Sequence, residues 1–177
     1  MKAKIYTHSY KSPVGEILLG DFEGKLCLAD WQYRKMRHAI DKRIQKGLDA
    51  EYKKETTPLL QETVKQFNEY FKKERQEFDL SLLFVGTDFQ QKVWSSLCKI
   101  PYGTTNTYLG LSQKMDNEKA IRAVASANGA NAISIIVPCH RIIGKNGALV
   151  GYAGGLPAKK KLLELEDALD KSQLSLF

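Results

Sequence analysis

Short hydrophobic runs separated by turn-forming residues open the chain. The apolar runs fall at positions 5–6, 17–19 and 26–31. Between them lie Ser12-Pro13-Val14-Gly15 and Phe22-Glu23-Gly24, which are typical turn segments. Short apolar runs bounded by such segments are typical of β-strands. The pattern therefore predicts several short strands within residues 4–32.

Helical periodicity begins near Pro58, a residue that suits the first position of a helix. Leu60, Val64, Phe67 and Phe71 recur at steps of four, three and four. This spacing places all four side chains on one helical face. The spacing therefore predicts a helix with one apolar face.

The segments on either side of this helix carry weaker patterns. Residues 33–56 are dense in Lys, Arg and Glu, which predicts an exposed helix with a flanking loop. A further strand is expected at Asp79–Leu83. Together these features predict an α/β N-terminal domain, a small sheet plus helices, over residues 1–84.

The second half of the chain is predicted to be mainly helical. Thr87 and Gln90 are spaced like a capping box, and Phe89, Val93, Trp94 and Leu97 give the next helix a buried face. Two short helices are expected at Tyr108–Lys114 and Glu118–Ala127, with Asn128-Gly129 as a stop. Such a pair is typical of a helix-turn-helix, although an ordinary helical hairpin has the same spacing.

A short active-site strand completes the predicted C-terminal domain, residues 85–169, and residues 170–177 form a tail. Ile133–Val137 is apolar and rich in β-branched residues, as in a buried strand. Pro138 cannot donate to a strand ladder, so the strand should stop there. Cys139 is therefore expected where a buried strand ends.

Composition narrows the class of protein. With 27 Lys and Arg against 20 Asp and Glu, the net charge of +7 favours a polyanionic partner such as nucleic acid. No apolar run is long enough to span a membrane, and no export signal opens the chain, so we expect a cytoplasmic protein. We also expect it to be a monomer. Three cysteines without paired spacing argue against disulfides, and no metal or other cofactor is expected.

Cys139 and His140 are the candidate reactive pair. A thiolate is a strong nucleophile, and an imidazole can take the thiol proton directly or through a water molecule. The base also needs a third group to orient it, usually a carboxylate. Taken alone, the pair also fits a packing cysteine beside a satisfied polar histidine.

The sequence around this pair is similar to the O6-alkylguanine-DNA alkyltransferase family. Ile136–Ile143, which contains Pro138-Cys139-His140-Arg141, resembles the active-site motif of that family. Further matching segments keep the family order and spacing: Phe89–Trp94, Ile100–Thr105, Arg122–Val124, Gly151–Gly155 and Leu162–Glu166. The resemblance covers residues 86–168 well and the N-terminal half only loosely.

The resemblance implies a role for each matching residue. Cys139 corresponds to the alkyl acceptor, His140 to a base acting through water, and Glu166 to the carboxylate that orients it. Asn131 corresponds to the residue that braces the turn before the active-site strand. Tyr108 corresponds to a residue that meets the flipped base and helps guanine to leave.

Further matches concern the substrate and the DNA. Four residues are expected to line the substrate pocket: Val137, Ile142, Tyr152 and Ala153. Four others are expected at the DNA: Arg122, Asn117, Ala123 and Lys145. Arg122 corresponds to the finger that replaces the extruded nucleotide in the base stack, while Asn117 and Lys145 correspond to phosphate contacts.

Three positions depart from the family pattern. Ala132 and Ser134 stand where many members have proline, which is expected to loosen the loop without removing a chemical group. Ala153 stands where some members have a serine that can contact O6. The preference among adducts is therefore expected to differ, and repair of O4-methylthymine is left open.

The C-terminal tail carries a separate candidate motif. Its residues, Gln173, Leu174, Ser175, Leu176 and Phe177, resemble the short motif by which bacterial repair proteins dock on the sliding clamp. A tail that folds back on its own domain is the alternative.

The sequence leads to one main functional hypothesis and two others. The main one is a single-turnover methyltransferase that moves an alkyl group from O6-alkylguanine in double-stranded DNA to Cys139. A cysteine hydrolase using Cys139, His140 and either Asn131 or Glu166 would turn over many times. A module that binds DNA lesions without catalysis would not need Cys139.

Overall fold

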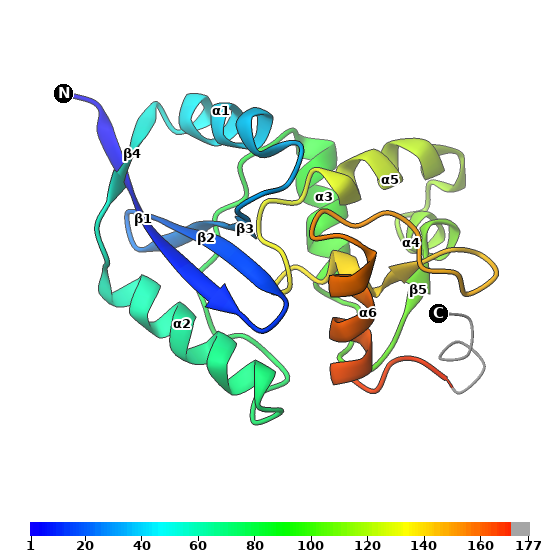
Figure 1. The fold of residues 1–177 in the computed structure, drawn as a ribbon. Coiled ribbons are helices and arrows are strands. Elements are labelled where there is room, and N and C mark those ends of the chain that lie inside the picture. Colours follow the sequence, from blue (N-terminus) through cyan, green and yellow to red (C-terminus); the bar gives the residue numbers. More distant parts are fainter. Residues whose placement is uncertain (171–177) are drawn as a thin grey trace. The chain divides into compact units, whose positions relative to one another are not determined.

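The computed structural model describes residues 1–170 and divides into two compact units, Met1–Thr87 and a second unit that starts at Asp88 (Figure 1). The candidate clamp-docking motif, Gln173–Phe177, lies outside the described residues. No helix within residues 1–170 is both long enough and apolar enough to cross a membrane.

The first unit is built on a four-stranded sheet. Its elements are β1 (Ala3–Ser12), β2 (Gly15–Phe22), β3 (Lys25–Trp31), α1 (Arg37–Gly47), β4 (Ala50–Lys54) and α2 (Pro58–Phe71). The strand order is β3-β2-β1-β4, in which β2 is antiparallel to both neighbours and β4 is parallel to β1. A parallel neighbour needs a crossover connection, and the segment containing α1 lies in it.

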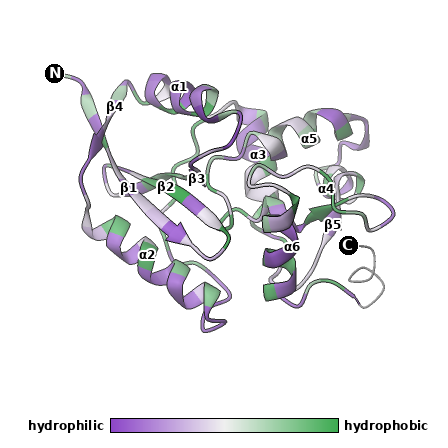
Figure 2. Cartoon of the chain, in the orientation of Figure 1, coloured by the Kyte–Doolittle hydropathy of each residue, from purple (hydrophilic) through white to green (hydrophobic). Residues whose placement is uncertain are grey.

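Helix α2 begins where the sequence predicts and packs on β1, β2 and β3. The Thr57 hydroxyl caps it by accepting a hydrogen bond from the Leu60 N–H at 3.3 Å. Phe67 is fully buried and stacks on Tyr10 with ring centroids 5.5 Å apart. Hydrophobic and hydrophilic positions alternate along α2, as its amphipathic sequence requires (Figure 2).

Two predictions for the first unit need correction. The charged segment 33–56 contains not only helix α1 but also strand β4, whose alternation is hidden by lysines and glutamate on a sheet edge. Asp79–Leu83 does not form a regular strand. It makes one isolated bridge, Leu82 with Leu26, supported by Leu26 N–H to Ser81 O at 2.8 Å.

The second unit is mainly helical, which agrees with the predicted fold class. Its elements are α3 (Asp88–Leu97), β5 (Asn106–Thr107), α4 (Tyr108–Lys114), η1 (Glu118–Ala120), α5 (Ile121–Gly129), η2 (Cys139–Arg141), β6 (Ile142–Ile143) and α6 (Leu156–Leu165). Helices α3 and α4 both pack on α5. The Trp94 indole N–H donates to Ala127 O at 2.8 Å and fastens α3 to α5.

The predicted helix-turn-helix pair corresponds to α4 and α5. The connection is tight, with Asp116 at a φ of 54°, and the second helix starts with the 3-10 turn η1. The first helix is capped by Thr107, whose hydroxyl accepts from the Gly110 N–H at 3.0 Å.

The strand predicted at Ile133–Val137 is wrong. The segment is a tight turn with an isolated bridge between Ser134 and Val137, and Ile135 has a φ of 72°. A positive φ is rare for a β-branched residue and interrupts any strand. The short strand beside Cys139 is instead β6, which follows the cysteine and pairs in parallel with β5.

Candidate active site

Cys139 opens the 3-10 turn η2 and is 3% exposed. The turn at Ile135 redirects the chain so that the Cys139 N–H donates to Val137 O at 2.8 Å. The sulfur accepts a hydrogen bond from Asn131 Nδ2 at 3.2 Å. A donor aimed at the sulfur favours its thiolate form over the thiol.

Asn131 holds the turn that leads to the cysteine. Its Nδ2 also donates to Val137 O at 3.0 Å, and its Oδ1 accepts from the Ile133 N–H at 2.9 Å. The side chain is 3% exposed, so these bonds are shielded from water. The same amide therefore ties the backbone turn and the sulfur together.

His140 is fully buried and forms a pair with Glu166. Its Nε2 lies 2.8 Å from Glu166 Oε1. Burial lowers the pKa of His140, and the hydrogen bond and charge of Glu166 oppose that shift only in part. Nδ1 is also buried and has no hydrogen-bond partner among the described residues. The neutral ring therefore has one nitrogen held by a carboxylate and one left to accept a proton.

Glu166 follows α6 directly and is 1% exposed. Arg141 donates two hydrogen bonds to its carboxylate, Nε to Oε2 at 2.8 Å and Nη2 to Oε1 at 2.9 Å. Burial alone raises the pKa of Glu166, but the bonds and charges of His140 and Arg141 outweigh it and lower the pKa to about 2. The carboxylate is therefore ionised at neutral pH.

Gly103 lets the chain pass close to this carboxylate residue. Its φ is 75°, and a Cβ there would come within 3.1 Å of Glu166 O. Glycine meets both requirements without steric cost. The Ile100–Gly103 segment also supplies Ile100 O, which accepts from Arg141 Nη1 at 2.6 Å.

Lys159 is a site residue that could not be identified from the sequence. It lies on α6 with no exposed surface, and its ammonium group donates to Ile142 O, to Val150 O at 2.8 Å and to Gly151 O at 3.3 Å. Burial lowers the pKa of Lys159 to about 8, while the nearby charge of Cys139 raises it. A lysine in an amphipathic helix is ordinarily solvated, so only the folded structure reveals it.

Tyr108 is the first residue of α4 and is half-buried. Burial raises the pKa of its hydroxyl, and the charge of Cys139 raises it further. A Cβ built on Gly151 would lie 3.9 Å from the Tyr108 hydroxyl. The phenol therefore sits beside the segment that carries Tyr152 and Ala153.

The residues expected to line the pocket divide into two groups. Val137 and Ile142 are fully buried on either side of η2. Tyr152 and Ala153 are half-buried in the segment between β6 and α6. The Tyr152 ring meets the His140 ring edge-on, with centroids 6.5 Å apart.

The residues expected at the DNA are all exposed. Asn117 precedes η1, Arg122 and Ala123 lie in the first turn of α5, and Lys145 follows β6. A ligand in solvent could therefore reach all four side chains. Their exposure contrasts with the buried Asn131, His140 and Glu166.

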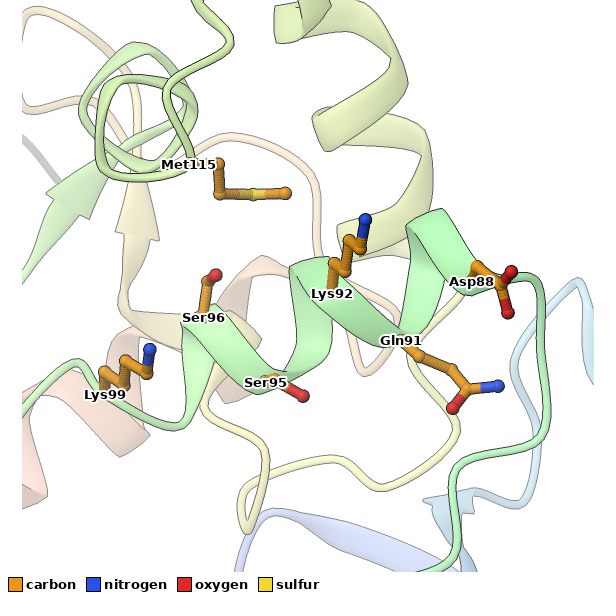
Figure 3. Close-up of a pocket in the computed structure, with 7 residues that line it drawn as sticks. All are labelled: Asp88, Gln91, Lys92, Ser95, Ser96, Lys99 and Met115. Carbon is orange, nitrogen blue, oxygen red and sulfur yellow. The ribbon is translucent and has the colours of Figure 1, made fainter.

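A groove of about 530 Å³ lies elsewhere in this unit, over α3 (Figure 3). Its lining residues are Asp88, Gln91, Lys92, Ser95, Ser96, Lys99 and Met115. Lys92, Ser96 and Lys99 rise from α3 on the side of Met115, whereas Ser95 and Gln91 point away from it (Figure 3). The groove contains neither Cys139 nor His140, so it is not the candidate active site.

No group of three His, Cys, Asp or Glu side chains within residues 1–170 is placed to hold a metal ion. Cys27, Cys98 and Cys139, all within that part of the chain, form no disulfide.

Both units match known protein families. Residues 88–168 match the DNA-binding domain of 6-O-methylguanine DNA methyltransferase, and residues 5–84 match the ribonuclease-like domain of the same enzyme. The chain belongs to the 6-O-methylguanine DNA methyltransferase family.

Relatives of this methyltransferase family match over nearly the whole chain. The methylated-DNA–protein-cysteine methyltransferase of Methanosarcina barkeri is 43% identical over 92% of this chain and 98% of its own length. The constitutive enzyme of Bacillus subtilis is 40% identical over 89% of this chain and 92% of its own.

Solved structures of the family have the same fold. A crystal structure of Mycobacterium tuberculosis O6-methylguanine methyltransferase is 36% identical, with a TM-score of 0.76 over 98% of this chain and 99% of that one. Mycobacterium tuberculosis OGT in complex with DNA is also 36% identical, with a TM-score of 0.77 over 97% of this chain and 99% of that one.

Proposed function

We propose that the protein is a methylated-DNA–protein-cysteine methyltransferase that repairs O6-alkylguanine in DNA by moving the alkyl group to Cys139 in a single turnover. The observation that carries the proposal is the buried cluster in which Asn131 donates to the Cys139 sulfur while Glu166 holds the neighbouring His140. A DNA-binding unit that only recognised lesions would not need such a cluster.

The first step is formation of the nucleophile. The Cys139 thiol gives its proton to His140 Nδ1, the nitrogen that Glu166 leaves unpartnered, and a water molecule can carry the proton between them. Glu166 then stabilises the imidazolium that forms, because its carboxylate remains ionised. Asn131 and the nearby Lys159 favour the thiolate.

Alkyl transfer follows as a displacement at carbon. The Cys139 sulfur forms a bond to the carbon attached to O6, and the bond between that carbon and O6 breaks. The electron pair goes to the guanine, which leaves more readily if its ring accepts a proton as charge develops. Tyr108, beside the segment that carries Ala153, is the proposed proton donor. The backbone N–H of Ala153 is proposed to donate to O6.

The reaction ends with the protein consumed. The product at Cys139 is a thioether, which has no activated bond for water to attack. Regeneration would require a further nucleophile able to remove the alkyl group from sulfur, and none of the proposed residues fills that role. One molecule of protein therefore repairs one base.

DNA binding is assigned to the exposed edge of the helix-turn-helix. An alkylated base within a duplex is out of reach of a buried sulfur, so it must rotate out of the stack at a cost of a few kcal/mol. Arg122 is proposed to enter the vacated position from α5, while Ala123 allows close approach to the minor groove. Asn117 and Lys145 are proposed to contact phosphates.

The decisive experiment is a mass measurement on the intact protein. Purified protein is mixed with a duplex oligonucleotide containing O6-methylguanine, and the modified peptide is then mapped. We expect one added methyl group, on the peptide that bears Cys139, and one repaired base for each protein molecule. Cys139→Ser removes the proposed acceptor, and Cys98→Ser is the matched control.

The outcomes separate the three functional classes. Repair of many equivalents of DNA would support a cysteine hydrolase instead. DNA binding without any mass gain, and unchanged by Cys139→Ser, would support a lesion-binding module. Methylation in Cys139→Ser but not in Cys98→Ser would place the acceptor at Cys98 and contradict the proposal.

A further inference from the structure

The solvent side of α3 carries cations and small polar side chains that have no role in the scheme above. Val93, Trp94 and Leu97 bury the other side of this helix in the second unit. The solvent side, together with Lys99 just beyond the helix, lines the groove of about 530 Å³ (Figure 3). This side of α3 is therefore hollowed and open to a ligand.

Three polar side chains share one side of this groove, which we call the Met115 side. They are Lys92, Ser96 and Lys99, and all three rise from α3 on the side of Met115 (Figure 3). Both lysines are exposed, and within residues 1–170 neither forms an ion pair. Asp88, the acidic residue of the lining, lies in the first turn of α3, where the positive end of the helix dipole offsets its charge. The Met115 side therefore carries two positive charges without a counterion from the described chain.

The residue types of the groove fit phosphate groups better than they fit a protein partner. Lysine, serine and glutamine side chains are common donors to the phosphate oxygens of DNA. Lysine, serine and aspartate are depleted in protein–protein interfaces, whose binding energy comes largely from aromatic anchors. None of the seven described residues that line the groove is aromatic, so it also lacks the stacking surface that unpaired bases need. The lining therefore suits the backbone of a DNA duplex.

The groove also adjoins one of the proposed phosphate contacts. Its wall residue Met115 follows α4 directly and lies two residues before the exposed Asn117. The turn between them is closed by hydrogen bonds back to α4, such as Asn117 N–H to Ser112 O at 3.0 Å. A DNA strand that meets Asn117 can therefore continue past Met115 into the groove.

We propose that the Met115 side of the α3 groove is a second site for the DNA backbone, in which Lys92 and Lys99 bind phosphates of the strand that continues from Asn117. This inference rests on the proposed function, in which the second unit binds DNA. The two lysines are seven residues apart, a rise of about 10 Å along a helix, so they meet different phosphates. The Ser96 hydroxyl donates to the same strand between them. Such a site makes no base contact, so it strengthens binding to damaged and undamaged DNA alike.

The test measures how the full-length protein binds an undamaged duplex oligonucleotide at several salt concentrations. The double variant Lys92→Gln/Lys99→Gln removes both charges and keeps polar side chains. Each neutralised phosphate contributes about 0.9 to the slope of log K against log salt, so the slope should become shallower by about 1.8. The dissociation constant should rise at low salt and approach the wild-type value at high salt. The melting temperature should stay unchanged, because both lysines are exposed.

Two comparisons separate the groove from a general effect of net charge. Lys65 and Lys72 are also exposed and seven residues apart, in α2 and at its C-terminal cap, and Lys65→Gln/Lys72→Gln should leave the slope unchanged. Ser96→Glu places a negative charge between the two groove lysines. It should weaken binding more than Ser95→Glu, because Ser95 points away from Met115 (Figure 3). Alkyl transfer from free O6-benzylguanine, which carries no phosphate, should keep its wild-type rate in every variant.

The possible failures can be told apart. An unchanged slope in Lys92→Gln/Lys99→Gln, or an equal change in Lys65→Gln/Lys72→Gln, overturns the proposal. A dimer that the wild type forms without DNA, and that Lys92→Gln/Lys99→Gln abolishes, would assign the groove to a second copy of the chain and also overturn it. Wild-type protein that binds the duplex but gains no methyl group on Cys139 counts against the proposed function, while the salt slope still tests the groove.

Discussion

Each unit of the molecule contains one buried carboxylate held by two cationic or potentially cationic groups. In the first unit, Asp30 on β3 has no exposed surface and accepts from Arg34 Nη1 at 3.1 Å and Arg37 Nη1 at 3.0 Å. In the second, Glu166 is held by Arg141 and His140. The two clusters differ in one partner, an arginine in the first and a histidine in the second.

That difference separates a structural cluster from a reactive one. A guanidinium keeps its proton at any physiological pH, so the Asp30 cluster can only hold the chain in place. An imidazole exchanges its proton near neutral pH. His140 uses one nitrogen for Glu166, and its Nδ1 has no hydrogen-bond partner within residues 1–170. The second cluster can therefore pass a proton while it also stabilises the fold.

The largest expected effects come from removing one carboxylate charge at a time. Glu166→Gln and Asp30→Asn each keep shape and remove charge. Each should lower the free energy of unfolding by about 3–5 kcal/mol, because a buried partner loses its counterion. Only Glu166→Gln should also slow methyl transfer per folded molecule, by about 10²–10⁴-fold, the usual contribution of acid–base catalysis.

The measurement pairs denaturant unfolding with single-turnover repair at a temperature where both variants are folded. Arg37 keeps a further contact in Asp30→Asn, from its Nε to Asp41 Oδ1 at 3.0 Å. A comparable loss of repair in folded Asp30→Asn would remove the distinction between the two clusters.

The second prediction concerns pH and sharpens the contrast between histidine and arginine. The folded-state pKa of His140 is lowered by burial, so the unfolded chain binds a proton that the folded protein resists. Stability is therefore complete above the unfolded pKa of about 6.5 and is lost as pH falls, by up to about 1.4 kcal/mol per pH unit. His140→Gln can keep a hydrogen bond to Glu166 and should lack this slope.

Glu166 supplies an internal reference at lower pH. Its folded-state pKa is lowered to about 2, so its contribution is present above the unfolded pKa and is lost as pH falls toward 2. Both the wild type and His140→Gln should show that acid loss. Urea unfolding between pH 7 and pH 3 measures both regions, and the same slope near pH 6 in both proteins would contradict the assignment to His140.

The elements that the sequence predicted well are those with a clear helical period. Helix α2 starts at Pro58 and α4 spans Tyr108–Lys114 as expected. The buried face of α2 is rotated slightly, because Thr63 and Tyr70 are buried whereas Val64 and Phe71 are only half-buried. Periodicity locates a helix but does not fix which edge of its face meets the sheet.

The predicted strand before Cys139 shows why composition alone can mislead. Ile133–Val137 has the β-branched residues of a strand, but Asn131 draws the Val137 carbonyl back and Ile135 adopts a positive φ. This turn depends on a side chain outside the segment, so local propensity does not reveal it. The strained backbone at Ile135 therefore lies close to the nucleophile Cys139 in the chain.

The candidate site was only partly visible in the sequence. Cys139, His140 and Arg141 are adjacent in the chain, whereas Glu166 was linked to them by family resemblance. Lys159 was not singled out. It sits among other lysines on an amphipathic helix, so its burial is a property of tertiary packing.

The smallest expected effect comes from a variant of Lys159. This variant tests whether the reactive cluster of His140, Arg141 and Glu166 extends to that cation. Lys159→Met keeps a long side chain but removes the charge near Cys139. It also leaves three backbone carbonyls without their donor, those of Ile142, Val150 and Gly151. The thiolate population at a given pH should fall, and repair should slow about tenfold, the effect of about 1.4 kcal/mol. Lys160→Met, next in the chain and partly exposed, is the matched control.

A second measurement follows the reactivity of Cys139 toward iodoacetamide against pH. The pH profile of this reactivity should shift to higher pH in Lys159→Met alone. If only repair slows and this profile stays fixed, Lys159 shapes the pocket through the carbonyls, and the proton-passing cluster ends with His140 and Glu166.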